Sequence, residues 1–145
     1  MFSPEMEASP THQLERLYKH TQLAVQEALA QHGLSLRDFW ALSITCAQQG
    51  VAQRTVAQAL AVDPSEVTYI VDRLEQRGWV RRRQDPADRR RHALSSTKAG
   101  RAAHEELHLL VTEAEQAALA VGPKRLRQLG KLVAETFGES PRNLH

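Results

Sequence analysis

With 145 residues, of which 41% are hydrophobic and 25% are charged, the chain has the size and composition of one globular domain. Its single cysteine excludes an internal disulfide framework, and its seven glycines form neither GxGxxG nor GxxxxGK, which excludes the common nucleotide-binding loops. The net charge of +2 is unevenly distributed: residues 50–103 hold 11 Lys and Arg against 6 Asp and Glu, whereas both flanks are slightly acidic. A basic central segment of this kind is typical of proteins that contact nucleic acid.

Apolar residues recur at three- and four-residue spacings in six segments, which predicts six amphipathic helices. Several ends carry cap signals: Ser35 and Asp38 resemble a capping box, and Asp63 is a good N-cap before Pro64 at the first helical position. The predicted helices cover, in chain order, residues 11–32, 36–49, 51–60, 64–77, 97–121 and 124–137.

The third and fourth predicted helices are joined by a three-residue turn, as in a helix-turn-helix unit. Two predicted strands, 79–84 and 92–96, flank the turn sequence DPADRR and indicate a hairpin wing with a basic tip. The predicted fold class is therefore mainly α with a small β-hairpin wing (α+β), arranged as a winged helix-turn-helix with flanking helices. We expect one domain over residues 1–145, with the winged lobe over 36–100 and the flanking helices over 11–32 and 97–137.

The run from Leu60 to Gly100 resembles the recognition helix and wing of the MarR family of bacterial transcription regulators. The matching pieces are VDRLEQRGWV at 71–80, DPADRR at 85–90 and the start of the next helix at 97–100. One departure is Ser96, where such sequences usually place a leucine, and this departure is expected to weaken one core contact at the strand end.

The resemblance implies a homodimer whose terminal helices pack across a two-fold axis and whose recognition helices meet successive major grooves of double-stranded DNA with a near-palindromic operator. We expect a transcriptional repressor released by a small aromatic or anionic effector, without a cofactor. The chain has no apolar run of about 18 residues and no secretory signal, so we expect a cytoplasmic protein without a membrane partner. The apolar faces expected in the dimer interface include Leu107, Leu110, Leu126, Leu129, Val133 and Phe137.

The fourth predicted helix, with Val67, Ile70, Val71 and Leu74 turned inward, fits the major groove through its other face. At the basic wing tip, the resemblance implies an Asp-x-Arg pair that reaches the minor groove, where arginine is favoured. We expect Asp88 to hold the tip arginines in position and Asp72 to pair with a strand arginine. The predicted DNA-binding residues are Arg54, Thr55, Ser65, Glu66, Thr68, Tyr69, Arg73, Asp88, Arg89 and Arg90.

Residues 104–108 read HEELH, the HExxH pattern of zinc peptidases. A zinc peptidase also needs a third ligand and a substrate cleft. The sequence of this small helical protein indicates neither, so we expect neither a metal site nor catalysis. Regulatory metal binding and a metal-dependent hydrolase are the alternatives for this motif. For the whole chain, the other alternative is a winged-helix module that docks a protein and binds little DNA.

The remaining candidates concern ligands and redox chemistry. Cys46 falls on the inner face of the second predicted helix, where free cysteine usually packs without reacting; redox sensing by a low-pKa thiol is the alternative. Tyr18 and Trp40 suit either a core or a ligand cage. Because similar proteins bind effectors between the dimer helices and the DNA-binding lobe, the predicted ligand-binding residues are Tyr18, Trp40 and His104.

Overall fold

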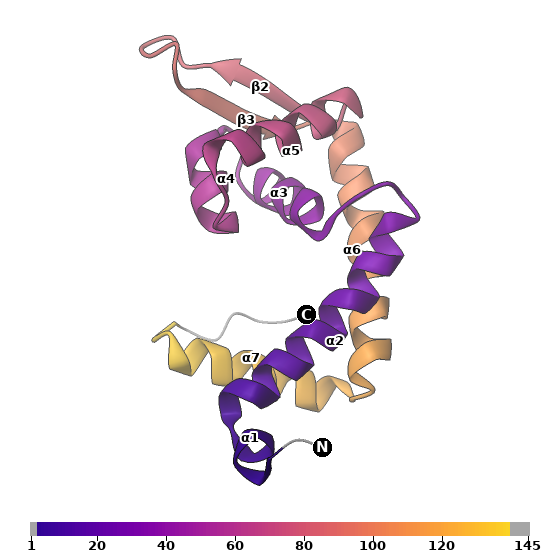
Figure 1. The fold of residues 1–145 in the computed structure, drawn as a ribbon. Coiled ribbons are helices and arrows are strands. Elements are labelled where there is room, and N and C mark those ends of the chain that lie inside the picture. The colour runs from indigo at the N-terminus through magenta and orange to yellow at the C-terminus, as the bar shows by residue number, and fades with distance from the viewer. Residues whose placement is uncertain (1–2, 140–145) are drawn as a thin grey trace. The chain divides into compact units, whose positions relative to one another are not determined.

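The computed structural model describes residues 3–139, which contain seven helices and a small three-stranded sheet (Figure 1). The helices are α1 (Pro4–Ala8), α2 (Pro10–Ala30), α3 (Leu36–Ala47), α4 (Gln53–Leu60), α5 (Pro64–Gln76), α6 (Lys98–Leu119) and α7 (Pro123–Thr136). The strands are β1 (Val51–Ala52), β2 (Val80–Gln84) and β3 (His92–Ser96). The predicted fold class, mainly helical with a hairpin wing, is confirmed.

The chain divides into two compact units. One joins the two ends of the chain, up to Ala24 and from Glu113 onward, and contains α1, α7 and parts of α2 and α6. The other covers Val25–Thr112 and contains the sheet together with α3, α4 and α5. Among the described residues, no helix is both long and apolar enough to cross a membrane.

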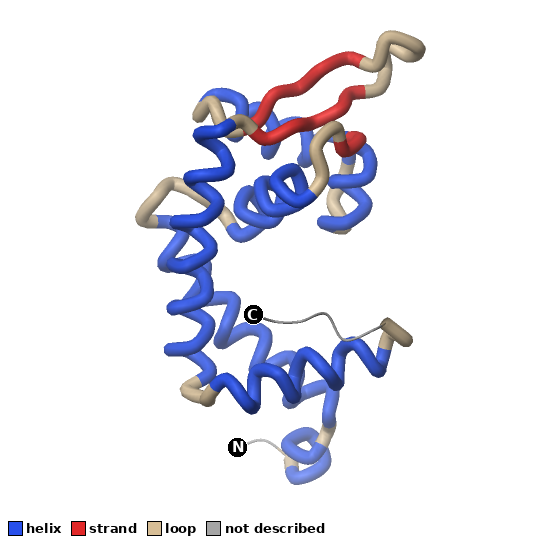
Figure 2. Tube along the Cα trace, turned by 180° about the vertical axis from the view of Figure 1, so that it is seen from behind, coloured by secondary structure: helices blue, strands red, loops and turns tan. Residues whose placement is uncertain are grey.

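The sheet is antiparallel in the order β1-β3-β2, and the hairpin strands pair from Val80 opposite Ser96 to Gln84 opposite His92 (Figure 2). Strand β1 was not predicted, because residues 51–60 were expected to form one helix. Val51 and Ala52 instead pair with β3, and the helix begins only at Gln53. A two-residue strand has no periodicity of its own and is specified by its partner.

The core of the Val25–Thr112 unit forms where α3, α4 and α5 pack against one another and against the sheet. The four residues predicted to point inward from α5, Val67, Ile70, Val71 and Leu74, are each 1% exposed. Burial of this apolar stripe fixes which face of α5 turns outward. The predicted core of the recognition helix is therefore confirmed.

Local signals placed most helix ends within one or two residues. The capping box at the start of α3 is confirmed: Ser35 Oγ accepts from Asp38 N, and Asp38 Oδ2 accepts from Ser35 N. Asp63 stands at the N-cap of α5, but its side chain makes no cap hydrogen bond. The short α1 was not predicted, because five residues without a buried side chain carry no amphipathic repeat.

Candidate nucleic-acid interface

The outward face of α5 carries three of the predicted DNA-binding residues. Ser65 and Tyr69 are exposed, Tyr69 by 67%, and Thr68 lies at the edge of the same face. The Thr68 hydroxyl donates to Pro64 O at 2.9 Å and accepts from Gln53 Nε2 at 3.1 Å. Since the hydroxyl proton is used within the chain, Thr68 offers a partner chiefly its methyl group and a lone pair.

The start of α4 lies beside that face, because Gln53 in its first turn bonds Thr68 on α5. Arg54 and Thr55 follow Gln53 and are exposed. The N-cap residue Ala52 supplies no side-chain hydrogen bond, so the first-turn N–H groups keep their donors for an external acceptor. Free N–H groups at a positive helix end suit a backbone phosphate.

Glu66 and Arg73 occupy the opposite edge of α5 and bind α3. Arg37 pairs with Glu66, and the Arg73 guanidinium donates to Asp38 Oδ1 from Nη2 at 2.6 Å and from Nε at 3.2 Å. Residues 66 and 73 stand two helical turns apart, so both face α3. Both side chains were predicted to bind DNA; the structure shows that they pair with α3, and their contact with DNA stays a prediction.

A second set of contacts fastens α5 to the wing. Arg82 of β2 pairs with Asp72 at 2.7 Å, and its backbone N–H donates to Glu75 at 3.0 Å. The predicted pairing of Asp72 with a strand arginine is therefore confirmed. Arg82 also donates to Thr68 O at 3.5 Å, so this one residue joins the base of the hairpin to three residues of the recognition helix.

The wing tip is shaped by two aspartates. Asp85 accepts from Ala87 N at 2.9 Å and Asp88 accepts from Arg90 N at 3.0 Å, which are Asx-type turns. The carboxylate of Asp88 also pairs with Arg91 at 3.4 Å. Asp88 thus contacts the Arg90 backbone and the Arg91 side chain, which agrees with the holding role expected of it.

Arg89 and Arg90 lie in the turn at this tip. Both residues are exposed, and neither side chain forms an ion pair within residues 3–139. In Figures 1 and 2 the hairpin runs alongside α5 and its loop extends beyond the helices. The predicted DNA-binding residues without an ion pair to α3 are Arg54, Thr55, Ser65, Thr68, Tyr69, Arg89 and Arg90, with Asp88 as support.

The predicted effector residues are not core residues. Tyr18 is 56% exposed and Trp40 is 42% exposed. His104 is half-buried: its Nε2 lies 2.9 Å from Ser43 Oγ and its ring stacks on Phe39 at 5.7 Å. Trp40 and His104 belong to the Val25–Thr112 unit and Tyr18 to the other unit.

The HEELH motif places the rings of His104 and His108 in a stack, 6.0 Å apart. His104 Nε2 is engaged with Ser43, and among residues 3–139 no group of three His, Cys, Asp or Glu side chains is arranged to hold a metal.

Cys46 Sγ lies 4.0 Å from Gly100 O, and burial raises the pKa of its thiol above the ordinary 9.0. A raised pKa disfavours the thiolate that redox sensing requires.

His104 makes stability depend on pH. Burial, followed by the charge of His108, lowers the pKa of His104 below its ordinary 6.5. The unfolded chain therefore takes up a proton before the folded chain does, so stability is complete above pH 6.5 and falls as the pH drops through the lowered value. Urea unfolding at about pH 7.5 and about pH 5 should show a smaller acid loss in His104→Gln than in the unsubstituted protein. Equal losses would contradict this assignment.

Comparison with known proteins identifies the family. The MarR family model matches residues 32–91. A MarR-family transcriptional regulator from Rhodococcus sp. RHA1 is 30% identical over 87% of this chain and 90% of that one, with a TM-score of 0.79. CouR from Rhodococcus jostii RHA1, solved with p-coumaroyl-CoA, is 30% identical over 92% of this chain and 95% of that one, with a TM-score of 0.76. CouR solved on a 23-mer DNA duplex is 25% identical over 94% of this chain and 97% of that one, with a TM-score of 0.81.

Two curated relatives match over shorter segments. A putative transcriptional regulatory protein for the hcr operon of Thauera aromatica is 36% identical over 41% of this chain. The transcriptional repressor MdtR of Bacillus subtilis is 29% identical over 65% of it. The matches span 36% and 61% of those two proteins. Identity of 30% across nine-tenths of a solved regulator, with the same winged helix-turn-helix fold, shows that this chain belongs to the MarR family.

Proposed function

We propose that the protein is a dimeric, sequence-specific DNA-binding transcriptional regulator that represses transcription in the cytoplasm until a small molecule releases it. The observation that carries the proposal is that Arg89 and Arg90 are exposed and form no ion pair within residues 3–139, in a wing that runs alongside α5. The similarity to CouR, which was solved on a DNA duplex, and to the repressor MdtR supports the same function.

In this function α5 enters the major groove. Ser65 and Tyr69 reach base edges or phosphates, and the Thr68 methyl group suits apolar contact with a thymine methyl. The start of α4 holds a phosphate through Arg54, Thr55 and its free N–H groups. Arg89 and Arg90 occupy the neighbouring minor groove, where narrow A·T-rich stretches attract arginine.

The wing is tested by removing one arginine. Arg90→Ala should weaken binding to the intergenic DNA upstream of the protein's own gene by about tenfold or more, and should reduce the slope of log affinity against log salt by about 1. Fluorescence anisotropy at several salt concentrations measures both quantities. Arg125→Ala, which removes an exposed arginine of α7, is the matched control and should bind as the unsubstituted protein does. If Arg90→Ala also binds unchanged, the wing has no part in DNA binding.

Dimerisation is supported by exposed apolar residues on α2 and at the end of α7. Leu14 is 58%, Val133 47% and Phe137 73% exposed, and exposed apolar patches mark surfaces that bind a partner. Leu107 was expected in the interface but is 5% exposed, because it already packs inside the Val25–Thr112 unit. Sedimentation equilibrium should give about twice the chain mass of 16.3 kDa. A monomer would contradict the two-site mode of DNA binding.

An effector acts in this proposal by binding better to a dimer whose recognition helices do not fit successive grooves, because only differential affinity shifts such an equilibrium. CouR was solved with p-coumaroyl-CoA, an aromatic and anionic molecule. Trp40 and His104, together with Tyr18, remain the proposed effector residues. The ring of His104 is held in one orientation by stacking with Phe39 and His108 and by the contact of its Nε2 with Ser43.

A further inference from the structure

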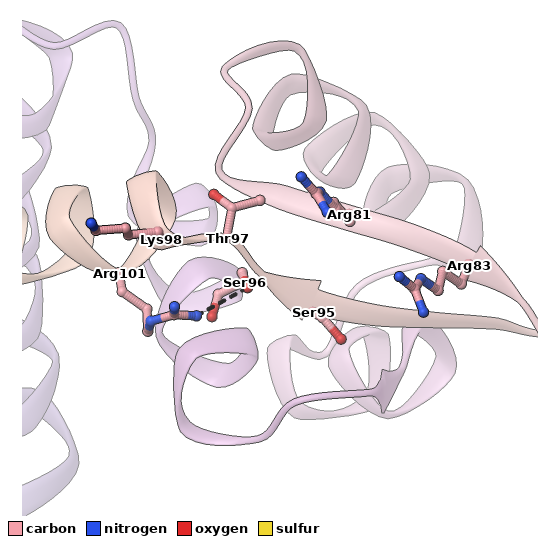
Figure 3. A pocket seen from close by; sticks show the side chains of 7 residues that line it. All are labelled: Arg81, Arg83, Ser95, Ser96, Thr97, Lys98 and Arg101. Atoms are coloured by element: carbon pink, nitrogen blue, oxygen red, sulfur yellow. Dashed lines mark hydrogen bonds between the residues drawn. The ribbon is translucent and has the colours of Figure 1, made fainter.

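A cleft of about 340 Å³ lies where the hairpin meets the start of α6, within the Val25–Thr112 unit (Figure 3). This volume is in the range of small-molecule sites. The cleft is lined by four cationic and three hydroxyl side chains and by no acidic one: Arg81, Arg83, Ser95, Ser96, Thr97, Lys98 and Arg101.

Strand alternation brings two of the cations together. Val80 and Arg82 of β2 point to the core side, where Arg82 meets α5, so Arg81 and Arg83 point to the opposite face of the sheet. Arg81 stands opposite Ser95 in the register, which places a hydroxyl on the same face. The cleft therefore opens on the side of the sheet away from the recognition helix.

The other two cations come from the first turn of α6. That turn contains Lys98 and Arg101 and no acidic residue. Positive side chains there meet the positive end of the helix dipole, an unfavourable arrangement that an anion reverses. Arg101 is held in place by a 3.2 Å hydrogen bond from Nη1 to Ser96 O, which orients its remaining donors.

The free donors of the cleft match an anion. Ser95 Oγ accepts from Gly50 N at 3.0 Å, which leaves its proton to donate outward. Thr97 differs from Ser95, because its hydroxyl donates to Gly78 O at 2.6 Å and accepts from Gly100 N. Its proton is therefore used within the chain, where Thr97 caps the start of α6. Within residues 3–139, none of the four cationic side chains forms an ion pair.

We propose that this cleft binds a small polyanion that carries phosphate or carboxylate groups, through Arg81, Arg83, Lys98 and Arg101 with Ser95. Four like charges without counter-charge repel one another, and a polyvalent anion removes that repulsion while forming charge-assisted hydrogen bonds. The site is separate from the effector residues Trp40 and His104 and does not depend on the proposed DNA binding.

Isothermal titration calorimetry of the full chain, at constant ionic strength and without DNA, tests the site with two probes, inorganic pyrophosphate and citrate. We expect saturable binding of one anion per chain. Stronger binding of pyrophosphate indicates a phosphorylated ligand, and stronger binding of citrate indicates a polycarboxylate; either result supports the site. Arg81→Gln combined with Lys98→Gln should weaken binding by at least about tenfold, as expected when charge-assisted hydrogen bonds are lost.

The control is Lys124→Gln combined with Arg125→Gln, which removes the same charge from exposed positions on α7 and should leave anion affinity unchanged. Circular dichroism melting of both variants checks that they fold. Three results would overturn the proposal: no saturable binding of either probe, equal weakening in the control, or unchanged pyrophosphate binding in the cleft variant together with a lower salt slope for DNA. The last result would make the cleft a contact for the DNA backbone.

Discussion

Replacing Gly100 by alanine should destabilise the protein by about 3 kcal/mol, because the new methyl group has no space. A Cβ at this position would lie 2.0 Å from the carbonyl oxygen of Trp79, 2.8 Å from its carbonyl carbon and 3.0 Å from its Cα. These are backbone atoms that cannot rotate away. The same carbonyl accepts the Thr97 N–H at 2.9 Å, so moving it breaks the junction between the hairpin and α6.

Urea unfolding monitored by circular dichroism measures the Gly100→Ala effect. Helix propensity alone favours alanine over glycine by about 1 kcal/mol, so a loss of stability would run against propensity and report the clash. Gly122→Ala is the matched control, since a Cβ there meets no heavy atom within 4 Å. It should change the free energy of unfolding by less than about 1 kcal/mol. A Gly100→Ala variant as stable as this control would show that the close contact with Trp79 is absent.

Asp38→Ala is the second large effect, with an expected loss of about 2–4 kcal/mol. The side chain of Asp38 is 3% exposed. One carboxylate oxygen accepts from Ser35 N at 2.8 Å and Ser35 Oγ at 2.9 Å, and the other accepts from Arg73 at 2.6 Å. The substitution therefore removes the cap of α3 and its link to the recognition helix together.

Chemical unfolding of Asp38→Ala should be compared with that of Asp63→Ala. Asp63 also precedes a helix, but it is exposed and its side chain makes no cap hydrogen bond, so its loss should cost less than about 1 kcal/mol. Because one of the two ion pairs that join α5 to α3 is lost, Asp38→Ala should also weaken DNA binding under conditions in which the variant is folded. Equal stability losses at the two positions would disprove the role assigned to Asp38.

Much of the fold follows from local sequence signals. Three- and four-residue apolar spacing located six of the seven described helices, and caps such as Ser35 with Asp38 set their ends. The two hairpin strands begin and end within one residue of the predicted positions. These features depend on residues close in sequence, which periodicity and turn chemistry read directly.

Features that depend on distant partners were not predicted. Arg73 and Glu66 lie on a helix face suited to DNA, and only the packing of α3 shows that Asp38 and Arg37 take them. Ser96 was expected to weaken the core; it is 8% exposed and accepts a hydrogen bond from Gln49 Nε2 at 2.5 Å. A glutamine 47 residues earlier in the sequence thus satisfies the buried hydroxyl, which a reading of neighbouring residues does not reveal.

The alternation of side chains along β2 indicates the basic cleft in the sequence itself. In the run Arg81, Arg82, Arg83, a strand places the first and third side chains on one face and the second on the other. This alternation separates the arginine that binds α5 from the two that line the cleft. The total charge of the run does not distinguish the arginine that binds α5 from the two that line the cleft.

The central claim is that the exposed face of α5 reads a DNA sequence, and a selection of duplexes from a random-sequence pool tests it most directly. The account predicts enrichment of a near-palindrome whose half-sites lie about one helical turn apart, and relaxed preference within each half-site in the Tyr69→Ala variant. Recovery of a pool without sequence preference, although the protein is folded and dimeric, would contradict the claim and identify a winged-helix module that docks another protein.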